Sequence, residues 1–101
     1  MAGSGWVLRP AASADLEDIW LRGFAEWGPR QADLYADSLF AAFDLLAEFP
    51  ALARERAEIV PPVRIHPVGA HLVIYRWDGP VVEIVRILHA RQNLMAYVND
   101  G

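Results

Sequence analysis

The chain of 101 residues contains no cysteine, no lysine and no threonine, and its only aliphatic hydroxyl groups are those of Ser4, Ser13 and Ser38. Without cysteine, disulfides, thiol nucleophiles and cysteine-ligated metal sites are excluded. None of the serines lies in a Gly-x-Ser-x-Gly setting, which argues against covalent catalysis by serine. The three histidines lack the i, i+4 spacing of a helical zinc motif. We therefore expect no catalytic nucleophile, no metal site and no cofactor.

Long hydrophobic runs are also missing. No apolar run reaches the roughly 20 residues that span a bilayer, because Glu83 and Arg86 interrupt the longest one. Residues 1–5 lack the charged start and apolar core of a signal peptide, and we expect them to form a flexible leader. These features predict a single domain over residues 1–101, without internal repeats, that works in the cytoplasm and not in a membrane.

The formal net charge is −4, and it is divided unevenly along the chain. Residues 1–62 hold ten acidic residues and five arginines, whereas residues 63–101 hold three acidic residues and four arginines. Proteins that bind nucleic acid by themselves usually present a dense basic face to the phosphates. An acidic first part followed by a nearly neutral second part therefore argues against direct binding of DNA or RNA.

Hydrophobic residues are abundant: they make up 54% of the chain and include four tryptophans, four phenylalanines and three tyrosines. This content excludes disorder of the whole chain. A domain of this length buries only about two-thirds of the surface that its unfolded chain exposes. We therefore expect part of the apolar surface to be covered by another protein.

Two amphipathic helices are predicted in the first half of the chain. Ser13 is the expected N-cap of the first helix, and Gly28-Pro29 ends it and begins the second. Pro50 closes the second helix directly after Phe49. The apolar stripes consist of Leu16, Ile19, Trp20, Gly23 and Trp27 in the first helix and Ala32, Tyr35, Ala36, Leu39, Phe43 and Leu46 in the second. Two helices with so short a break form an antiparallel αα-hairpin, whose apolar face must pack on the strands.

A β-hairpin is predicted in the last third of the chain. Two β-branched runs, residues 71–76 and 81–89, are joined by a connector that contains Asp-Gly, which favours a tight turn. Because Pro80 cannot donate a ladder hydrogen bond, we place it in the loop and predict that Arg76 lies opposite Val81. The same register pairs Tyr75 with Val82, Val73 with Ile84 and His71 with Arg86, all on one face.

Shorter elements complete the prediction. Residues 6–9 are expected to form an opening strand, residues 51–59 a further helical turn, and residues 63–66 a strand that follows Pro61-Pro62. Residues 91–98 fit a short C-terminal helix. The predicted class is α+β with the order β-α-α-β-β-β, in which the αα-hairpin packs on one face of a mainly antiparallel sheet.

Five segments in fixed order span roughly residues 7–98. They are Ala14-Asp15-Leu16-x-x-Ile19-Trp20, Trp27-Gly28-x-x-Gln31-Ala32, Phe49-Pro50, His71-x-Val73-x-Tyr75-Arg76, and Val82-x-Ile84-x-Arg86-Ile87-Leu88-His89 followed by Arg91. This ordered set resembles the ParE toxins of bacterial toxin–antitoxin pairs, within the wider RelE/ParE superfamily. The resemblance covers nearly the whole chain, and it implies a compact sheet with the helix pair on one face.

The resemblance also implies a function. The chain is expected to be a non-enzymatic toxin that binds and inhibits DNA gyrase, neutralised in a hetero-oligomer by a ParD-like antitoxin. The target surface is expected at the arginine- and histidine-rich end of the sheet together with the C-terminal segment, and its candidate residues are Arg64, His71, Arg86, His89 and Arg91. The candidate antitoxin contacts, aromatic residues that also suit the core, are Trp20, Phe24, Trp27 and Tyr35.

Two other functions stay open. RelE-type relatives are ribosome-dependent messenger-RNA endonucleases, and Arg64, Arg86 and His89 are candidates for a phosphate clamp and a proton donor. The acidic charge and the lack of lysine argue against that chemistry. The other possibility is a non-toxic relative that only binds the antitoxin. Structural roles are open too: an ion pair of Arg86 with a helix acid, a backbone-bound His89, and a diagonal Arg76–Glu83 pair.

Overall fold

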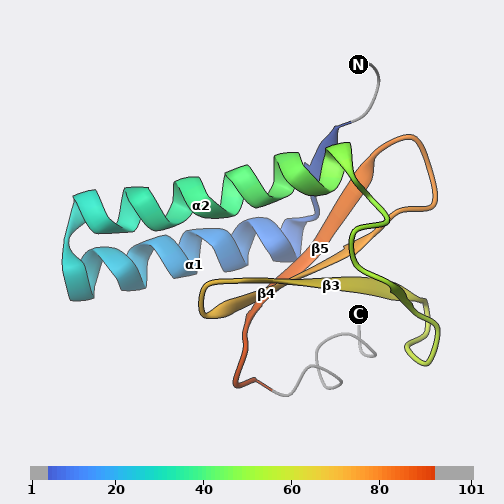
Figure 1. Cartoon of the computed structure of the whole chain (residues 1–101). Helices are drawn as coiled ribbons and strands as arrows, with labels where there is room; N and C mark the ends of the chain where they lie inside the picture. Colours follow the sequence, from blue (N-terminus) through green and yellow to red (C-terminus); the bar gives the residue numbers. More distant parts are fainter. Residues whose placement is uncertain (1–4, 93–101) are drawn as a thin grey trace.

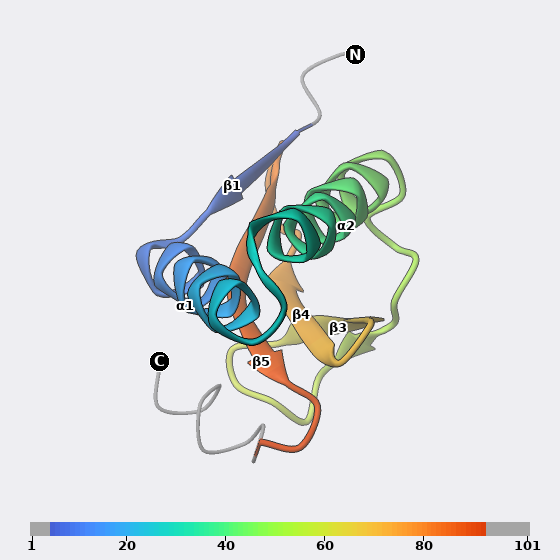
Figure 2. The same cartoon turned by 90° about the vertical axis from the view of Figure 1, so that its left-hand side faces the viewer.

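The computed structural model describes residues 5–92, in which two helices lie across a sheet (Figure 1). Helix α1 spans Pro10–Trp27 and helix α2 spans Pro29–Glu48. The helices run antiparallel to each other, and a view along them shows both on the same side of the strands (Figure 2). Within the described residues, no helix is long and apolar enough to cross a membrane.

The sheet has five strands in the order β1-β5-β4-β3-β2. In chain order the strands are β1 at Trp6–Leu8, β2 at Glu55–Arg56, β3 at Val63–Val68, β4 at His71–Arg76 and β5 at Val82–His89. Strand β1 runs parallel to β5, and the other pairings are antiparallel. The predicted α+β class, with a helix pair on a mainly antiparallel sheet, is confirmed. Most of the predicted C-terminal helix lies outside the described residues, which end in a turn at residues 90–92.

Helix α1 begins earlier than the sequence pattern predicts. Arg9 is its N-cap, without a side-chain cap, and Pro10 occupies the first turn. Proline suits this position because its fixed φ is helical and its missing N–H would have no helical partner there. The backbone N–H of Arg9 donates to the carbonyl of Ile84 at 3.0 Å, so β1 leads directly into the helix. Ser13 already donates its backbone N–H to the Arg9 carbonyl at 2.9 Å, and the prediction of Ser13 as the N-cap was wrong.

The break between the helices lies where it was predicted, at Gly28-Pro29. Gly28 has a φ of 89°, which glycine adopts without a steric penalty. Close to this break the helix backbones approach each other, since a Cβ added to Gly23 would lie 3.5 Å from Ala32. Small residues on both helices therefore permit the tight hairpin.

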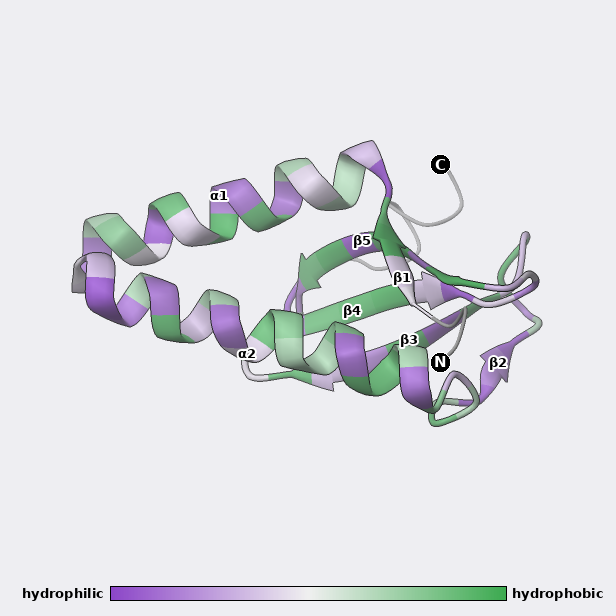
Figure 3. Cartoon of the chain, turned by 90° about the horizontal axis from the view of Figure 1, so that it is seen from above, coloured by the Kyte–Doolittle hydropathy of each residue, from purple (hydrophilic) through white to green (hydrophobic). Residues whose placement is uncertain are grey.

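The main core lies between the helix pair and the sheet. Its fully buried members from α2 are Leu39, Phe43 and Leu46. Its members from the strands are Val73, Tyr75, Val82, Ile84 and Ile87. Strands β4 and β5 are largely hydrophobic along their length, whereas the helices alternate between hydrophobic and hydrophilic faces (Figure 3). A second cluster consists of Ile59, Val63, Ile74 and Leu88, and its members from β4 and β5 alternate along the strands with residues of the main core.

The register of the β4–β5 hairpin differs from the prediction. Arg76 lies opposite Glu83 instead of Val81, and His71 lies opposite His89 instead of Arg86. The connector is longer than predicted, because Val81 stays outside β5. The pairing also shifts at a β-bulge.

At the bulge, Tyr75 pairs with Ile84 while Ile74 pairs with Arg86, which leaves Val85 as the extra residue. Because the bulge adds one residue, the side chains of β5 beyond it point to the opposite face of the sheet from the one that strict alternation gives. Ile87 therefore joins the core under the helices.

The predicted ion pair between Arg76 and Glu83 is not formed either. Arg76 pairs with Asp78 at 3.0 Å, and Glu83 lies 3.6 Å from Arg9. Both pairs are local to the connector and the β1 edge, and both are partly exposed to solvent.

The segment between α2 and β3 is also not helical. Its residues 55–56 form the short strand β2, which pairs with Val63 and Arg64. The predicted helical turn was wrong because pairing with β3 satisfies backbone groups that one isolated turn would leave to water. Strand β3 continues past its predicted end and includes Pro67, opposite Leu72 of β4. Proline is tolerated there because β2 pairs only with the start of β3, and within residues 5–92 no strand pairs with the rest of that edge.

Candidate binding groove

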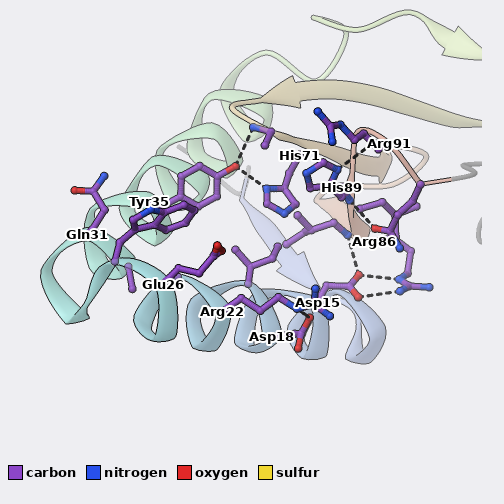
Figure 4. A pocket seen from close by; sticks show the side chains of 18 residues that line it. Asp15, Asp18, Arg22, Glu26, Gln31, Tyr35, His71, Arg86, His89 and Arg91 are labelled. Carbon is purple, nitrogen blue, oxygen red and sulfur yellow. Dashed lines mark hydrogen bonds and ion pairs between the residues drawn. The ribbon is translucent and has the colours of Figure 1, made fainter.

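A groove of about 830 Å³ separates the helix pair from the ends of β4 and β5. We call it the helix–sheet groove; Figure 4 shows the side chains that line it. From the helices these are Asp15, Asp18, Ile19, Arg22, Gly23, Glu26, Trp27, Gln31, Ala32 and Tyr35, and from the sheet end they are Ala70, His71, Arg86, Ile87, Leu88, His89, Arg91 and Gln92.

A two-point ion pair joins helix α1 to β5 at one wall of the groove. Arg86 donates from Nε and from one terminal nitrogen to the two carboxylate oxygens of Asp15, at 2.7 and 2.8 Å. Asp15 also accepts the backbone N–H of Ile87 at 2.9 Å. Strand β1 ends at Leu8, and beyond it the side chain of Asp15 takes over the role of a strand partner for β5. Charged hydrogen bonds in a partly buried setting hold α1 on the sheet.

A tyrosine and a histidine meet on the opposite wall. The Tyr35 hydroxyl lies 2.6 Å from Nδ1 of His71, accepts the backbone N–H of Ala70 at 3.1 Å and lies 3.3 Å from the Val68 carbonyl oxygen. A Cβ on Gly69 would lie 2.8 Å from this hydroxyl, and Gly69 has a φ of +56°, so the close contact requires glycine. Tyr35 thus anchors the β3–β4 turn to helix α2.

Burial shifts the titration of both partners. Desolvation raises the pKa of the Tyr35 phenol, and the hydrogen bond from Ala70 opposes that rise. Desolvation, and then the neighbouring His89, lower the pKa of His71, while Asp15 opposes the change. Burial therefore favours the neutral form of both side chains.

The end of β5 closes the groove with two histidines and a turn. The rings of His71 and His89 are 5.4 Å apart, centroid to centroid, in an edge-on arrangement. Nδ1 of His89 accepts the backbone N–H of Arg91 at 3.1 Å, and the His89 backbone N–H donates to the Gln92 side chain at 2.7 Å. These local bonds fix the His89 ring and the direction in which the chain leaves β5.

The other end of the groove is formed by the tip of the helix hairpin. The Trp27 side chain is 67% exposed and offers an apolar surface. Arg22 and Asp18 form an exposed ion pair one turn apart on α1 at 2.9 Å. Glu26 points into the groove from the same helix (Figure 4). This end is therefore apolar and acidic, in contrast to the histidine end.

The structure brings most of the predicted target residues together. His71, Arg86, His89 and Arg91 all line the groove. Arg64 does not, because it donates to the Ala53 carbonyl at 2.6 Å and lies 5.6 Å from the centre of the Trp77 ring, near the other end of the sheet. The ion pair of Arg86 with a helix acid, one of the open structural roles, is formed with Asp15.

The predicted antitoxin residues are divided between two places. Trp27 and Tyr35 line the groove, beside the predicted target residues. Trp20 and Phe24 lie outside it and pack against each other with centroids 5.2 Å apart, and the Trp20 indole N–H donates to Asp33 at 2.8 Å. Phe24, which does not belong to the predicted apolar stripe of the first helix, is 45% exposed.

Sequence reasoning missed the α1 side of the groove. Asp15 was not among the candidate site residues, although its spacing to Ile19, Arg22 and Glu26 places all four on one helix face. That spacing was the available signal. Among residues 5–92, no group of three or more histidine or acidic side chains is arranged to hold a metal ion.

Comparison with known proteins fits this architecture. The model of the family described as ParE toxin of type II toxin-antitoxin system, parDE, matches residues 7–94. The chain is 38% identical over 92 residues to toxin ParE1 of Mycobacterium tuberculosis, covering 90% of this chain and 94% of the relative. It is also 38% identical over 87 residues to toxin ParE1 of Caulobacter vibrioides, covering 86% of this chain and 90% of that relative.

A solved structure shares the fold. It is titled "Chromosomal ParDE TA system from P. aeruginosa", and it superposes with a TM-score of 0.74 at 21% identity, covering 87% of this chain and 98% of the other. The family match and the relatives each extend over most of the sequence, including both walls of the groove. The chain therefore belongs to the ParE toxin family of type II toxin–antitoxin systems.

Proposed function

We propose that this chain inhibits DNA gyrase by binding it, without catalysing a reaction, and that a ParD-like antitoxin neutralises it by occupying the helix–sheet groove. Membership of the ParE toxin family is the observation that carries the proposal. On this proposal the protein works in the cytoplasm, where both partners are found, and the groove residues His71, Arg86, His89 and Arg91 contact the target.

The internal bonding of the groove supports binding more than catalysis. Arg86 is held by Asp15, and His71 is held by Tyr35. A phosphate clamp for RNA cleavage needs arginines that are not already neutralised by a carboxylate. Asp18 and Glu26 add negative charge to the same groove, which opposes an incoming phosphate chain. The RelE-like endonuclease function is therefore the weaker alternative.

The apolar surface of the hairpin supports a protein partner. Trp27, Leu21 and Phe24 of α1 are 67%, 53% and 45% exposed. Large apolar side chains grouped on one element commonly mark a site of protein association. A segment of the antitoxin that packs along α1 and enters the groove at Trp27 would cover them.

A gyrase assay tests the target. Purified protein should inhibit supercoiling and increase the amount of cleaved DNA, and prior addition of the antitoxin should prevent both effects. Replacing His89 and Arg91 together with Ala should reduce inhibition at least tenfold while the thermal melt of the protein stays close to that of the wild type. The matched control is Arg30→Ala, an exposed arginine that does not line the groove.

A second readout separates the alternatives. If expression cuts ribosome-bound messenger RNA and leaves gyrase active, the endonuclease function replaces the proposal. If expression harms neither process while the antitoxin still binds, the chain is a non-toxic relative. The gyrase proposal requires intact messenger RNA together with cell filamentation.

A further inference from the structure

Each of the two groove histidines, His71 and His89, uses one ring nitrogen for a hydrogen bond within the fold and has the other ring nitrogen available. Nδ1 of His71 is engaged by the Tyr35 hydroxyl at 2.6 Å, and Nδ1 of His89 accepts the Arg91 backbone N–H at 3.1 Å. The Tyr35 hydroxyl lies closer to His71 Nδ1 than to the Val68 carbonyl oxygen, at 2.6 against 3.3 Å, so we assign its single proton to the bond with the histidine. A neutral imidazole whose Nδ1 accepts a hydrogen bond carries its proton on Nε2. Within residues 5–92, neither Nε2–H group has a hydrogen-bond partner. The ring centroids lie 5.4 Å apart, which brings the two imidazoles together at one end of the groove.

The charges around the histidines favour an anion at this end of the groove. Arg91 is exposed at the rim and has no carboxylate partner among the described residues. Asp15, the acid that acts electrostatically on His71, is already engaged by Arg86 and by the Ile87 backbone N–H. The view into the groove shows both imidazoles and Arg91 on the same side of it, away from Glu26 (Figure 4).

The rest of the groove selects the kind of anion. A nucleic-acid strand carries a phosphate at every nucleotide, and its neighbouring phosphates would lie beside Asp18 and Glu26. A peptide can carry one carboxylate next to apolar side chains, and these would pack against Ile19 and the exposed Trp27. The groove is therefore complementary to a peptide that is acidic at one end and apolar towards the tip of the helix hairpin.

We propose that His71 and His89 together bind one carboxylate of the antitoxin segment that fills the groove, through their Nε2–H groups and with Arg91 beside them. The inference rests on the proposed function, because it assigns the chemistry of the partner in the same groove. It also fixes the direction of that segment, with its acidic residue at the sheet end and its apolar residues at Trp27.

Binding of a carboxylate here is coupled to protons. The charged and titratable groups that face the histidines are Asp15, Asp18, Arg22 and Glu26 from α1, Tyr35 from α2, Arg86 from β5 and Arg91 from the turn. A carboxylate placed on the imidazoles favours their charged form, so the complex takes up protons that the free protein does not hold. Binding should therefore tighten as the pH falls towards the range in which histidine titrates.

The Tyr35 hydroxyl can serve both protonation states of His71. When His71 is neutral with its proton on Nε2, the phenol donates to Nδ1, 2.6 Å away. When His71 is protonated, Nδ1 becomes the donor, and the phenol proton can turn to the Val68 carbonyl oxygen, 3.3 Å away. Protonation of His71 on binding therefore leaves the contacts of Tyr35 with the β3–β4 turn intact.

Calorimetry with the cognate ParD-type antitoxin tests the proposal. The titration is made near pH 6.5 in MES and in Bis-Tris, whose ionisation enthalpies differ, so that the protons taken up can be counted. The test variant is His71→Asn with His89→Asn, because the asparagine oxygen replaces the Nδ1 acceptor while the Nε2–H donor is lost. The matched control is His66→Asn on β3, a histidine outside the groove.

We expect the double variant to bind the antitoxin about ten- to hundredfold more weakly and to lose the proton uptake, with the His66→Asn control unchanged. His89→Asn alone, at the end of β5, should weaken binding severalfold and serves if the double variant fails to fold. A folded double variant that keeps the wild-type affinity and proton uptake overturns the inference and leaves the proposed function standing.

Two further outcomes also decide the question. If the wild-type protein does not bind the antitoxin, this inference and the proposed occupant of the groove both fail, while the gyrase assay stands by itself. If a single-stranded RNA oligonucleotide binds and only that binding is lost in the double variant, the histidines recognise phosphate, and the peptide inference is overturned.

Discussion

Two tyrosines hold loops at opposite ends of the sheet, and they do so in different surroundings. Tyr75 is fully buried; its hydroxyl donates to the Pro50 carbonyl at 2.9 Å and accepts the Ala53 backbone N–H at 3.3 Å. Tyr35 is partly exposed, and its hydroxyl meets a backbone N–H and the imidazole of His71. The hydroxyl at the first end bonds only backbone groups, whereas the hydroxyl at the second end also bonds an imidazole, whose pKa is lowered by burial.

The difference separates a structural end from a functional one. Burial raises the pKa of both phenols, so neither tyrosine changes its charge in the physiological range. The groove end contains His71 and His89 and opens into the helix–sheet groove. The same hydrogen-bonding group therefore contributes rigidity at one end and adaptable recognition at the other.

The largest effect is expected where the groove end is attached to the helices. Asp15→Asn should lower the free energy of unfolding by about 2–3 kcal/mol, because Arg86 and the Ile87 N–H lose a charged acceptor in a partly buried place. Asp18→Asn on the same helix breaks only the exposed pair with Arg22 and should change the free energy of unfolding by less than about 0.5 kcal/mol. Urea unfolding measures both, and equal effects would contradict the importance of the Asp15 contact.

An intermediate effect is expected at the Tyr75 end of the sheet. Tyr75→Phe should lower the free energy of unfolding by about 1–2 kcal/mol, since the Pro50 carbonyl and the Ala53 N–H lose their partner in a buried site. The loss should be the same at every pH between about 5 and 8, because no group there titrates with the hydroxyl. Antitoxin affinity should not change. A strong pH dependence of this loss would show that the two ends are coupled.

The smallest effect is the pH dependence of the groove end. His71 in the unfolded chain takes up a proton near its ordinary pKa of 6.5, whereas burial holds the folded group neutral to lower pH. The unfolded state therefore binds more protons as the pH falls below that value, and the free energy of unfolding decreases until the folded group also titrates. His71→Asn should flatten this part of the profile, and His66→Asn should not. Thermal melts across the range provide the measurement.

Much of the fold could be predicted because its signals are local. The apolar stripes and the Gly28-Pro29 break defined both helices, and the β-branched runs defined the hairpin. Its register could not be predicted, since the bulge at Val85 is a property of backbone geometry that leaves no residue-type signal here. Strand β2 was missed for a related reason: two residues become a strand only through their pairing with β3.

The candidate site was predictable in part for the same physical reason. His71 begins the first strand of the hairpin, and His89 ends the second strand just before Arg91. The two strands of a hairpin lie side by side, so these residues gather at its open end. Asp15 could not be assigned, because its partner Arg86 lies 71 residues away in the sequence. Arg64 was grouped with the others by charge, although its strand carries it towards Trp77 at the other end of the sheet.

The long separation between Asp15 and Arg86 has a consequence for synthesis of the protein. Both the pairing of β1 with β5 and the contact of α1 with Arg86 join the beginning of the described chain to its last strand. A nascent chain that has reached Tyr75 can hold the helix hairpin and part of the sheet, but its groove still lacks one wall. Contacts of such long range form late in folding. Any activity of the groove therefore begins only after β5 has been synthesised.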